Sequence, residues 1–309
     1  MFKGLKNGWD VINASISAFF KHPIFLLPLL TVWIIYAPTI IYLKWHFNWT
    51  QYNTSETAAI LFFIIFGFSL LLTLSCSILL ELIQQKETGN KFNLLKSLKE
   101  TLTKNIIQII VLAFFWAILW FILTTLEAFL SRRNSTSEKE TENAENMART
   151  LANTGNVSLT SFSFDALKKG IRMIVFLIMP AFAWENFGIG KSIKRGLSIL
   201  KQRIPEFITG YTLSYLAAAI VFIPPAIMFK LSKDHVEFPD EAWVLCIIYI
   251  AFAWSYTIYL EQMFTAELYL RQMMWEKDVR KAIARGKKPP KFGQTISPSI
   301  VDDNADLIE

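Results

Sequence analysis

Long runs of apolar residues, separated by polar connections, dominate the pattern of this chain. A helix needs roughly 20 mostly apolar residues to cross a hydrocarbon core about 30 Å thick. The runs that meet this requirement are Ile24–Leu43, Ala58–Leu80, Ile106–Leu130, Ile171–Phe187, Phe207–Phe229 and Trp243–Leu270. Each must be helical, because a backbone in lipid has to satisfy its own hydrogen bonds. The pattern predicts an all-α, polytopic membrane protein with six transmembrane helices.

A short basic amphipathic stretch precedes the first, third and fifth runs. These stretches are Phe2–Lys21, Phe92–Lys104 and Ser192–Arg203, in which apolar residues recur every three or four positions and lysines occupy the other face. A helix of this kind is typical of the membrane interface. We therefore expect three helical hairpins, each preceded by a cytoplasmic interfacial helix. The units share only faint sequence similarity, so a divergent triplication and a coincidence of charge placement both stay open.

Lysine and arginine are concentrated in every second connection. The N-terminal segment, the second and fourth connections and the C-terminal tail hold 21 of them, against nine in the other connections. Because cytoplasmic loops carry the excess of cations, we expect both termini in the cytoplasm. The basic face favours anionic lipid head groups as partners and not nucleic acid. The expected location is the inner membrane of a bacterium, crossed several times.

Little of the chain lies outside the apolar runs. We expect one membrane domain over residues 1–285, with an external polar loop at 131–170, and a disordered cytoplasmic tail at 286–309. The loop is poor in apolar residues and cannot bury enough surface to fold alone. Both segments are too short for an unassisted catalytic domain, and the sequence shows no catalytic, metal or nucleotide motif. The sequence therefore predicts no enzyme and no cofactor.

Four carboxylates in or beside the runs are the candidate functional residues, because an ionisable group in a membrane is costly. Glu81 and Glu185 fall at the cytoplasmic ends of the second and fourth runs. Glu267 can pair with Arg271, four residues later on one helix face. Glu261 lies deep in the last run and has no cation three or four positions away. We expect Glu261 to face the protein interior, with Glu81 and Glu185 as its neighbours.

Prolines inside the runs mark candidate helix breaks. Pro180 lies in the fourth run, and the pair Pro224 and Pro225 lies in the fifth. A proline frees a backbone carbonyl, which can line a cavity or serve as a hinge. The sharpest bend is expected at Pro224 and Pro225, in the outer half of the fifth helix.

Two stretches resemble known membrane proteins. They comprise Gly8–Trp9, His22–Pro23 and Leu26–Leu30 in the first, and Met179–Pro180, Glu185, Gly188 and Lys191–Leu200 in the second. The chain is similar in style to uncharacterised prokaryotic six-helix membrane proteins and to the membrane domains attached to some glycerophosphodiester phosphodiesterases. The resemblance implies a six-helix fold. It does not carry over the phosphodiesterase activity, because this chain has no such catalytic domain.

Two functions from different classes fit these features. A non-enzymatic protein that binds or scaffolds a partner is favoured by the basic cytoplasmic face and by the lack of a charged pathway through the runs. The partner would be another protein or a second copy of this chain. The alternative is a small-solute transporter or channel, favoured by the hairpin pattern, the prolines and Glu261. A water-accessible cavity that reaches Glu261 would favour transport.

Overall fold

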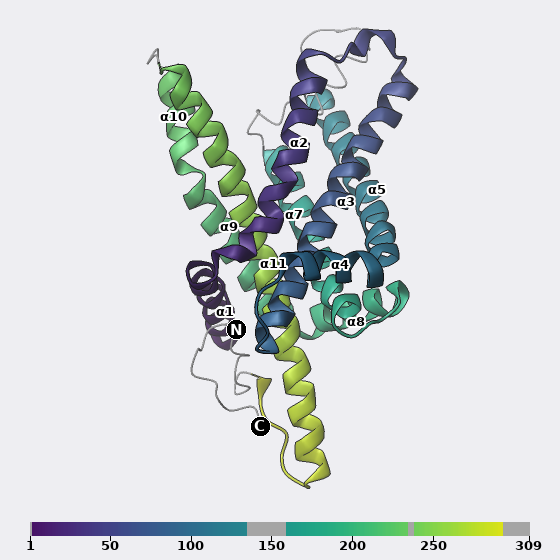
Figure 1. The fold of residues 1–309 in the computed structure, drawn as a ribbon, viewed down its shortest axis with the longest axis vertical. Helices are drawn as coiled ribbons and strands as arrows, with labels where there is room; N and C mark the ends of the chain where they lie inside the picture. Colours follow the sequence, from purple (N-terminus) through teal and green to yellow (C-terminus); the bar gives the residue numbers. More distant parts are fainter. Residues whose placement is uncertain (1, 135–158, 234–237, 293–309) are drawn as a thin grey trace.

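The computed structural model describes residues 2–134, 159–233 and 238–292, which form helices joined by short connections (Figure 1). The helices are α1 (Phe2–Lys21), η1 (Pro23–Leu26), α2 (Leu27–Trp45), η2 (Trp49–Gln51), α3 (Thr54–Glu87), α4 (Leu94–Lys104), α5 (Ile106–Asn134), α7 (Leu159–Ala183), α8 (Ile189–Gln202), α9 (Ile204–Val221), α10 (Ile223–Lys233) and α11 (Asp240–Ala284). No β-strand occurs in the described ranges. The all-α prediction is confirmed.

Five helices of the described chain are long and apolar enough to cross a membrane. The candidate spans are Pro23–Leu43, Thr54–Glu87, Ile106–Glu127, Ile204–Val221 and Asp240–Ala284. Their outer faces leave large apolar side chains exposed, among them Ile34, Phe63 and Ile220. Apolar surface of this extent marks contact with lipid or a partner. These features are those of a multi-pass membrane protein.

The helix of the fourth predicted run, α7, is not among these five and is enclosed by its neighbours. It begins at Leu159, earlier than the predicted Ile171, and carries Lys168, Lys169 and Arg172. Nearly all its side chains beyond these cations are buried, and it packs against α5, α8 and α11. A helix shielded from lipid can carry charges that a lipid-facing helix cannot. The charges therefore do not prevent α7 from lying at the centre of the bundle.

The predicted loop and tail are partly ordered. Both described ends of the predicted loop are helical, since α5 reaches Asn134 and α7 starts at Leu159, while 135–158 lie outside the described residues. In the predicted tail, residues 286–292 return along α11. There the indole of Trp275 donates to the Pro290 carbonyl at 3.0 Å, and Phe292 is buried. The remainder of the tail, 293–309, lies outside the described residues.

The prolines have different effects on the helices. The helices α9 and α10 are separated at Phe222, and Pro224 and Pro225 lie in the first turn of α10. Proline is tolerated there because first-turn N–H groups have no partner within the helix. Pro180 does not end α7, which continues to Ala183. The break therefore falls in the turn after Pro180, where the Trp184 N–H still donates to the Pro180 carbonyl at 2.9 Å.

Glycines allow three close helix crossings. A Cβ added to Gly210 of α9 would lie 2.0 Å from the Phe264 ring of α11. A Cβ on Gly196 of α8 would lie 2.7 Å from Ile178 of α7. A Cβ on Gly8 of α1 would lie 2.5 Å from the side chain of Thr209 on α9. At these crossings only glycine leaves room for the facing side chain.

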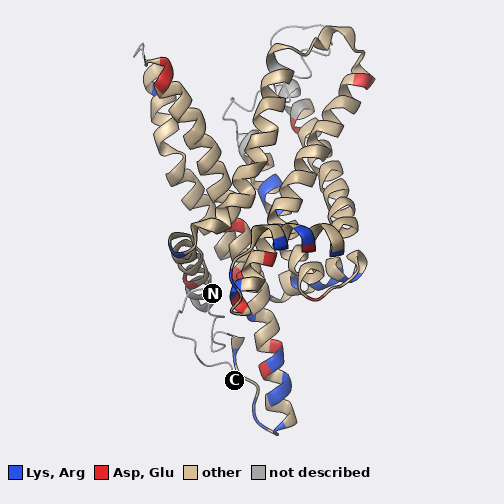
Figure 2. Ribbon diagram, viewed as in Figure 1, with Lys and Arg blue, Asp and Glu red and all other residues tan. Residues whose placement is uncertain are grey.

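The three predicted amphipathic helices are present as α1, α4 and α8, with α8 beginning at Ile189 and not at Ser192. They gather at one end of the bundle, here called the basal end, where α1 packs on α9 and α11, α4 on α3, and α8 on α7 (Figure 1). From this end α11 continues away from the other helices. Figure 2 shows that most described charges lie at the basal end and along this continuation. In the opposite part, the coloured segments are few and lie at helix tips or within the bundle, as a hydrocarbon layer requires.

Candidate functional site: a buried ion-pair cluster and a basal polar network

Glu261 of α11 is fully buried and is bound by two cations of α7. Arg172 donates from Nε to Oε2 at 2.7 Å and from Nη2 to Oε1 at 2.8 Å. Lys169 Nζ lies 3.3 Å from Oε1. A planar guanidinium suits this two-fold contact with a carboxylate. Glu261 thus faces the interior, as expected. The prediction that Glu81 and Glu185 are its neighbours is wrong, because the partners of Glu261 are the cations Arg172 and Lys169.

Aromatic rings and a thiol complete the surroundings of this cluster. Lys169 Nζ lies 5.4 Å and 5.1 Å from the ring centroids of Tyr211 and Tyr215 on α9. The negative faces of these rings attract the ammonium group. Cys76 of α3 is fully buried and close enough to interact electrostatically with Arg172. The cluster therefore joins α3, α7, α9 and α11 around two cations and one carboxylate.

A second ion pair ties α7 to α5. Lys168 pairs with Glu127 at 2.5 Å, and its ammonium group lies 5.8 Å from the Trp120 ring centroid. The sequence count placed Lys168 and Lys169 in an external loop, but both residues are only 6% exposed. They are interior ion-pair partners, and α7 is held by charge on two of its sides.

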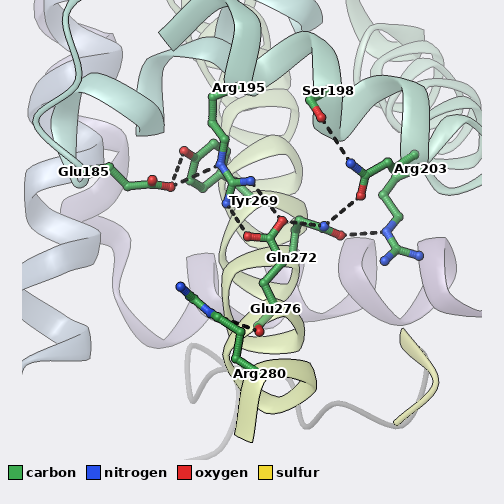
Figure 3. A network of polar contacts seen from close by, with 9 residues as sticks. Glu185, Arg195, Ser198, Arg203, Tyr269, Gln272, Glu276 and Arg280 are labelled. Carbon is green, nitrogen blue, oxygen red and sulfur yellow. Dashed lines mark hydrogen bonds and ion pairs between the residues drawn. The ribbon is translucent and has the colours of Figure 1, made fainter. Parts of the chain in front are cut away.

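Glu185 follows α7 and belongs to a polar network with α8 and α11 (Figure 3). Its Oε1 accepts from the Tyr269 hydroxyl at 2.6 Å and lies 3.4 Å from Arg195 Nε. Arg195 donates from both terminal nitrogens to Glu276, at 2.9 Å and 2.8 Å. Hydrogen bonding to Glu276 holds the pKa of Arg195 above its usual value. Arg195 therefore stays charged and links α8 to α11.

Gln272 extends this network along α11 (Figure 3). Its Oε1 accepts from Arg203 Nε at 2.8 Å, and its Nε2 donates to Gln202 at 3.1 Å and to Glu276 at 2.8 Å. The Arg203 guanidinium also lies 3.5 Å from the ring centroid of Phe292. The C-terminal end of α8 and the segment after α11 are thereby held on the same part of α11.

The remaining candidates, Glu267 and Glu81, lie in separate places. Glu267 pairs with Arg271 at 3.5 Å, four residues along α11, as the spacing predicted. Glu81 lines a pocket of about 220 Å³ between α3, α4 and the connection from α7 to α8. In the described residues, no three His, Cys, Asp or Glu side chains are grouped as metal ligands. The four carboxylates thus have distinct surroundings and do not form one site.

Sequence reasoning missed the cations that organise these sites. Arg172 lies inside the fourth predicted run, and Lys169 lies in the predicted external loop. Their spacing of three residues places both on one helix face at the start of an apolar run. A deep carboxylate such as Glu261 needs a cation, and this face was the available source. That combination is the signal that would have found the pair.

No family model, curated protein or solved structure matches this chain.

Proposed function

We propose that this protein is a non-enzymatic scaffold of the bacterial inner membrane. The proposed topology has six membrane-embedded helices, with α7 enclosed by the others and both termini in the cytoplasm. The helices α1, α4 and α8 lie at the cytoplasmic interface, where their lysines attract anionic head groups. The basic continuation of α11 presents a surface for a partner protein. The observation that carries this proposal is that α11 is held by ion pairs at two levels.

The helix α11 is much longer than a membrane crossing requires. It contains 45 residues, which at 1.5 Å per residue span roughly 67 Å, about twice the thickness of a hydrocarbon core. Arg172 holds it at Glu261, and Arg195 holds it again at Glu276. Each contact comes from a different neighbour, α7 and α8. A long helix fixed at two levels keeps its free end in a defined position.

The surroundings of Glu261 favour a structural role over transport. A carboxylate that carries a proton or cation must exchange partners and meet water during a cycle. Both oxygens of Glu261 accept from Arg172, and the side chain has no exposed surface. The pocket at the basal end is lined by Glu81 and not by Glu261. The geometry is that of a buried ion pair joining two helices.

The exposed end of α11 indicates the chemistry of the partner. Lys277, Arg280, Lys281 and Arg285 are exposed there, and we call these four residues the platform. A second copy of this chain would bring the same positive charge to a symmetric contact and would be repelled. An acidic surface on a different protein would be attracted and oriented. The platform therefore favours a hetero-partner over a homo-oligomer.

Site-specific photo-crosslinking in native membranes tests the proposal. A photoreactive residue at Lys281 should cross-link one discrete protein, and reversing the charge of Lys277 and Arg280 should abolish that product. The matched control is the same photoreactive residue at Ile220, whose side chain is 66% exposed on the apolar surface and should label lipid. The absence of a charge-dependent product at Lys281 would reject the scaffold function.

Transport remains the second candidate because of two observations. The cluster of Arg172, Lys169 and Glu261 holds one more cation than carboxylate. In the described structure, Gln262 is fully buried next to Glu261, and neither polar atom of its side chain has a hydrogen-bond partner. Spare donors and a surplus positive charge would suit a transported anion. Uptake of radiolabelled phosphate or chloride into liposomes that is lost on Lys169→Met would establish this alternative.

A further inference from the structure

The pocket beside Glu81 forms where three elements meet at the basal end. Glu81 and Gln84 come from the last turns of α3, and Lys96, Glu100 and Lys104 from α4. The connection between α7 and α8 closes the third side. The volume is about 220 Å³. Figure 2 shows charges of both signs close together around α4. The buried ion pairs of Glu261 and Glu127 and the network of Figure 3 do not use these residues.

The walls of the pocket are fixed by hydrogen bonds that do not occupy its charged groups. Gln85 donates to the Ser97 hydroxyl at 3.0 Å and accepts from the Asn93 N–H at 2.8 Å, which holds α4 against α3. On the other side, the Trp184 indole donates to the Leu80 carbonyl at 3.2 Å. The pocket is therefore a built feature of the fold and not a gap between loosely placed side chains.

Two acidic residues line this pocket together. Glu81 is only 3% exposed, and it shares the lining of the pocket with Glu100. Two carboxylates that line one small pocket favour a shared proton or a bound cation. A primary ammonium group, with three N–H donors, satisfies both of them. This end of the pocket therefore has the chemistry of an ammonium site.

The other charged groups of the pocket are cations. Lys96, Glu100 and Lys104 are spaced four residues apart and form one stripe along α4. Lys104 lies 3.9 Å from Glu100, at the outer limit of an ion pair, and its side chain is 57% exposed. Both lysines can thus turn to an anion at the rim. The stripe places positive charges on either side of Glu100.

The position of α4 sets the depth of the pocket in the membrane. Away from the stripe, Leu95 and Leu102 expose apolar side chains, with Leu95 79% exposed. A helix with one apolar and one charged face lies between acyl chains and head groups. The charged stripe, and with it the pocket, is then at the level of the phosphate and the group attached to it.

We propose that this pocket binds a phosphoethanolamine group, with its ammonium donating to Glu81 and Glu100 and its phosphate accepting from Lys96 and Lys104. The depth of the pocket assigns the group to the head of a phosphatidylethanolamine, although free phosphoethanolamine carries the same chemistry. The site recognises a zwitterion, which distinguishes it from general attraction of anionic lipid to basic helices. It is independent of whether the platform binds a partner.

Binding to the purified full chain in detergent tests this site. The probes are short-chain phosphatidylethanolamine, short-chain phosphatidylcholine and free phosphoethanolamine. Choline keeps the phosphate but has no N–H donor, so phosphatidylethanolamine should bind at least about tenfold more tightly. The variant Glu100→Gln should lose most of this preference, and Lys96→Gln should weaken both lipids. Lys99→Gln, on α4 but outside the pocket, is the control and should change neither affinity.

Each outcome decides the proposal. Glu100 is only partly buried, so Glu100→Gln should keep the melting temperature of the parent protein, which separates lost binding from lost folding. Competition between free phosphoethanolamine and the lipid supports one shared site, and tighter binding of the free compound would assign the soluble source. Equal binding of the two lipids, an unchanged preference in Glu100→Gln, or no binding of any probe would overturn the proposal.

Discussion

Arg172 on α7 binds both carboxylate oxygens of Glu261 on α11, at 2.7 Å and 2.8 Å, across 89 residues of sequence. The pair connects the enclosed central helix to the longest helix of the protein. Burying two charges is expensive, and the cost is offset only when geometry and extra hydrogen bonds are good. The two-fold contact with Arg172 supplies the geometry and the hydrogen bonds here, and Lys169 adds a second cation at 3.3 Å. The main effect of the pair is therefore to determine that α7 packs against α11. Its contribution to the net free energy of unfolding is small.

Removing one partner of this pair should be strongly destabilising. Glu261→Gln leaves Arg172 and Lys169 buried without a counter-charge, at a cost of about 3–5 kcal/mol. Folded yield and melting temperature in detergent should both fall. The triple variant Glu261→Leu, Arg172→Met, Lys169→Met should restore the folded yield and the melting temperature, because an apolar core needs no charge pairing. The control Glu241→Gln, at the exposed start of α11, should be neutral. Normal stability of Glu261→Gln would contradict the ion-pair account.

A methyl group at the crossing of α9 and α11 should also destabilise the fold. In Gly210→Ala the new Cβ would meet the fully buried Phe264 ring at 2.0 Å, which costs about 1–3 kcal/mol of overpacking. Phe264→Leu should recover part of the loss by making room. Gly67→Ala is the matched control, since nothing lies within 4 Å of its added Cβ. Equal melting temperatures for the two alanine variants would show that α9 and α11 do not cross closely at Gly210.

The contact between Arg195 and Glu276 should tolerate alkaline pH. Glu276 raises the pKa of Arg195 in the folded protein, so its contribution is complete below the ordinary pKa of arginine and is lost only above it. In Arg195→Lys, the two-fold hydrogen bond is lost, and the lysine can deprotonate near pH 10. The melting temperature of this variant should fall further below the parent protein at about pH 10 than at about pH 7. Lys194→Arg, at an exposed position, is the control. If the difference in melting temperature between Arg195→Lys and the parent protein became smaller as the pH rises, this description would be refuted.

The topology can be tested by reporter fusions. Fusions after Ser137 and at the C terminus should report opposite sides of the membrane, with the C-terminal fusion in the cytoplasm. The physical reason is the excess of cations in the basal connections, which are retained on the cytoplasmic side. Since Lys168 and Lys169 are interior residues, the external connections are less basic than the sequence count suggested. A C-terminal fusion active only outside the cytoplasm would reverse the proposed orientation.

Local sequence patterns predicted the helices better than their partners. The spacing of apolar residues found α1, α4 and α8, because an amphipathic helix carries its own period. The same pattern did not predict the start of α7, because its three cations are typical of a loop or an interface. Their acidic partners, Glu127 and Glu261, lie on other helices and are known only from the structure.

The surroundings of the candidate site depend on contacts that no local pattern encodes. Glu261 could be identified as a deep carboxylate from its place in an apolar run. Its partner Arg172 is 89 residues away, and Glu276, which binds Arg195, is 81 residues away from it. Such pairings are set by how the helices pack around glycines such as Gly210 and Gly196. They could be found only after the packing was known.

Flux through liposomes is the most direct measurement of the central claim, that Glu261 is a structural residue of a scaffold. The parent protein and the folded triple variant Glu261→Leu, Arg172→Met, Lys169→Met would be reconstituted side by side, with dyes sensitive to pH, to cations and to chloride inside. The account predicts that both proteins give the same proton, cation and chloride flux as protein-free liposomes. Flux above that baseline in the parent protein, absent from the folded triple variant, would contradict it and make Glu261 part of a transport mechanism.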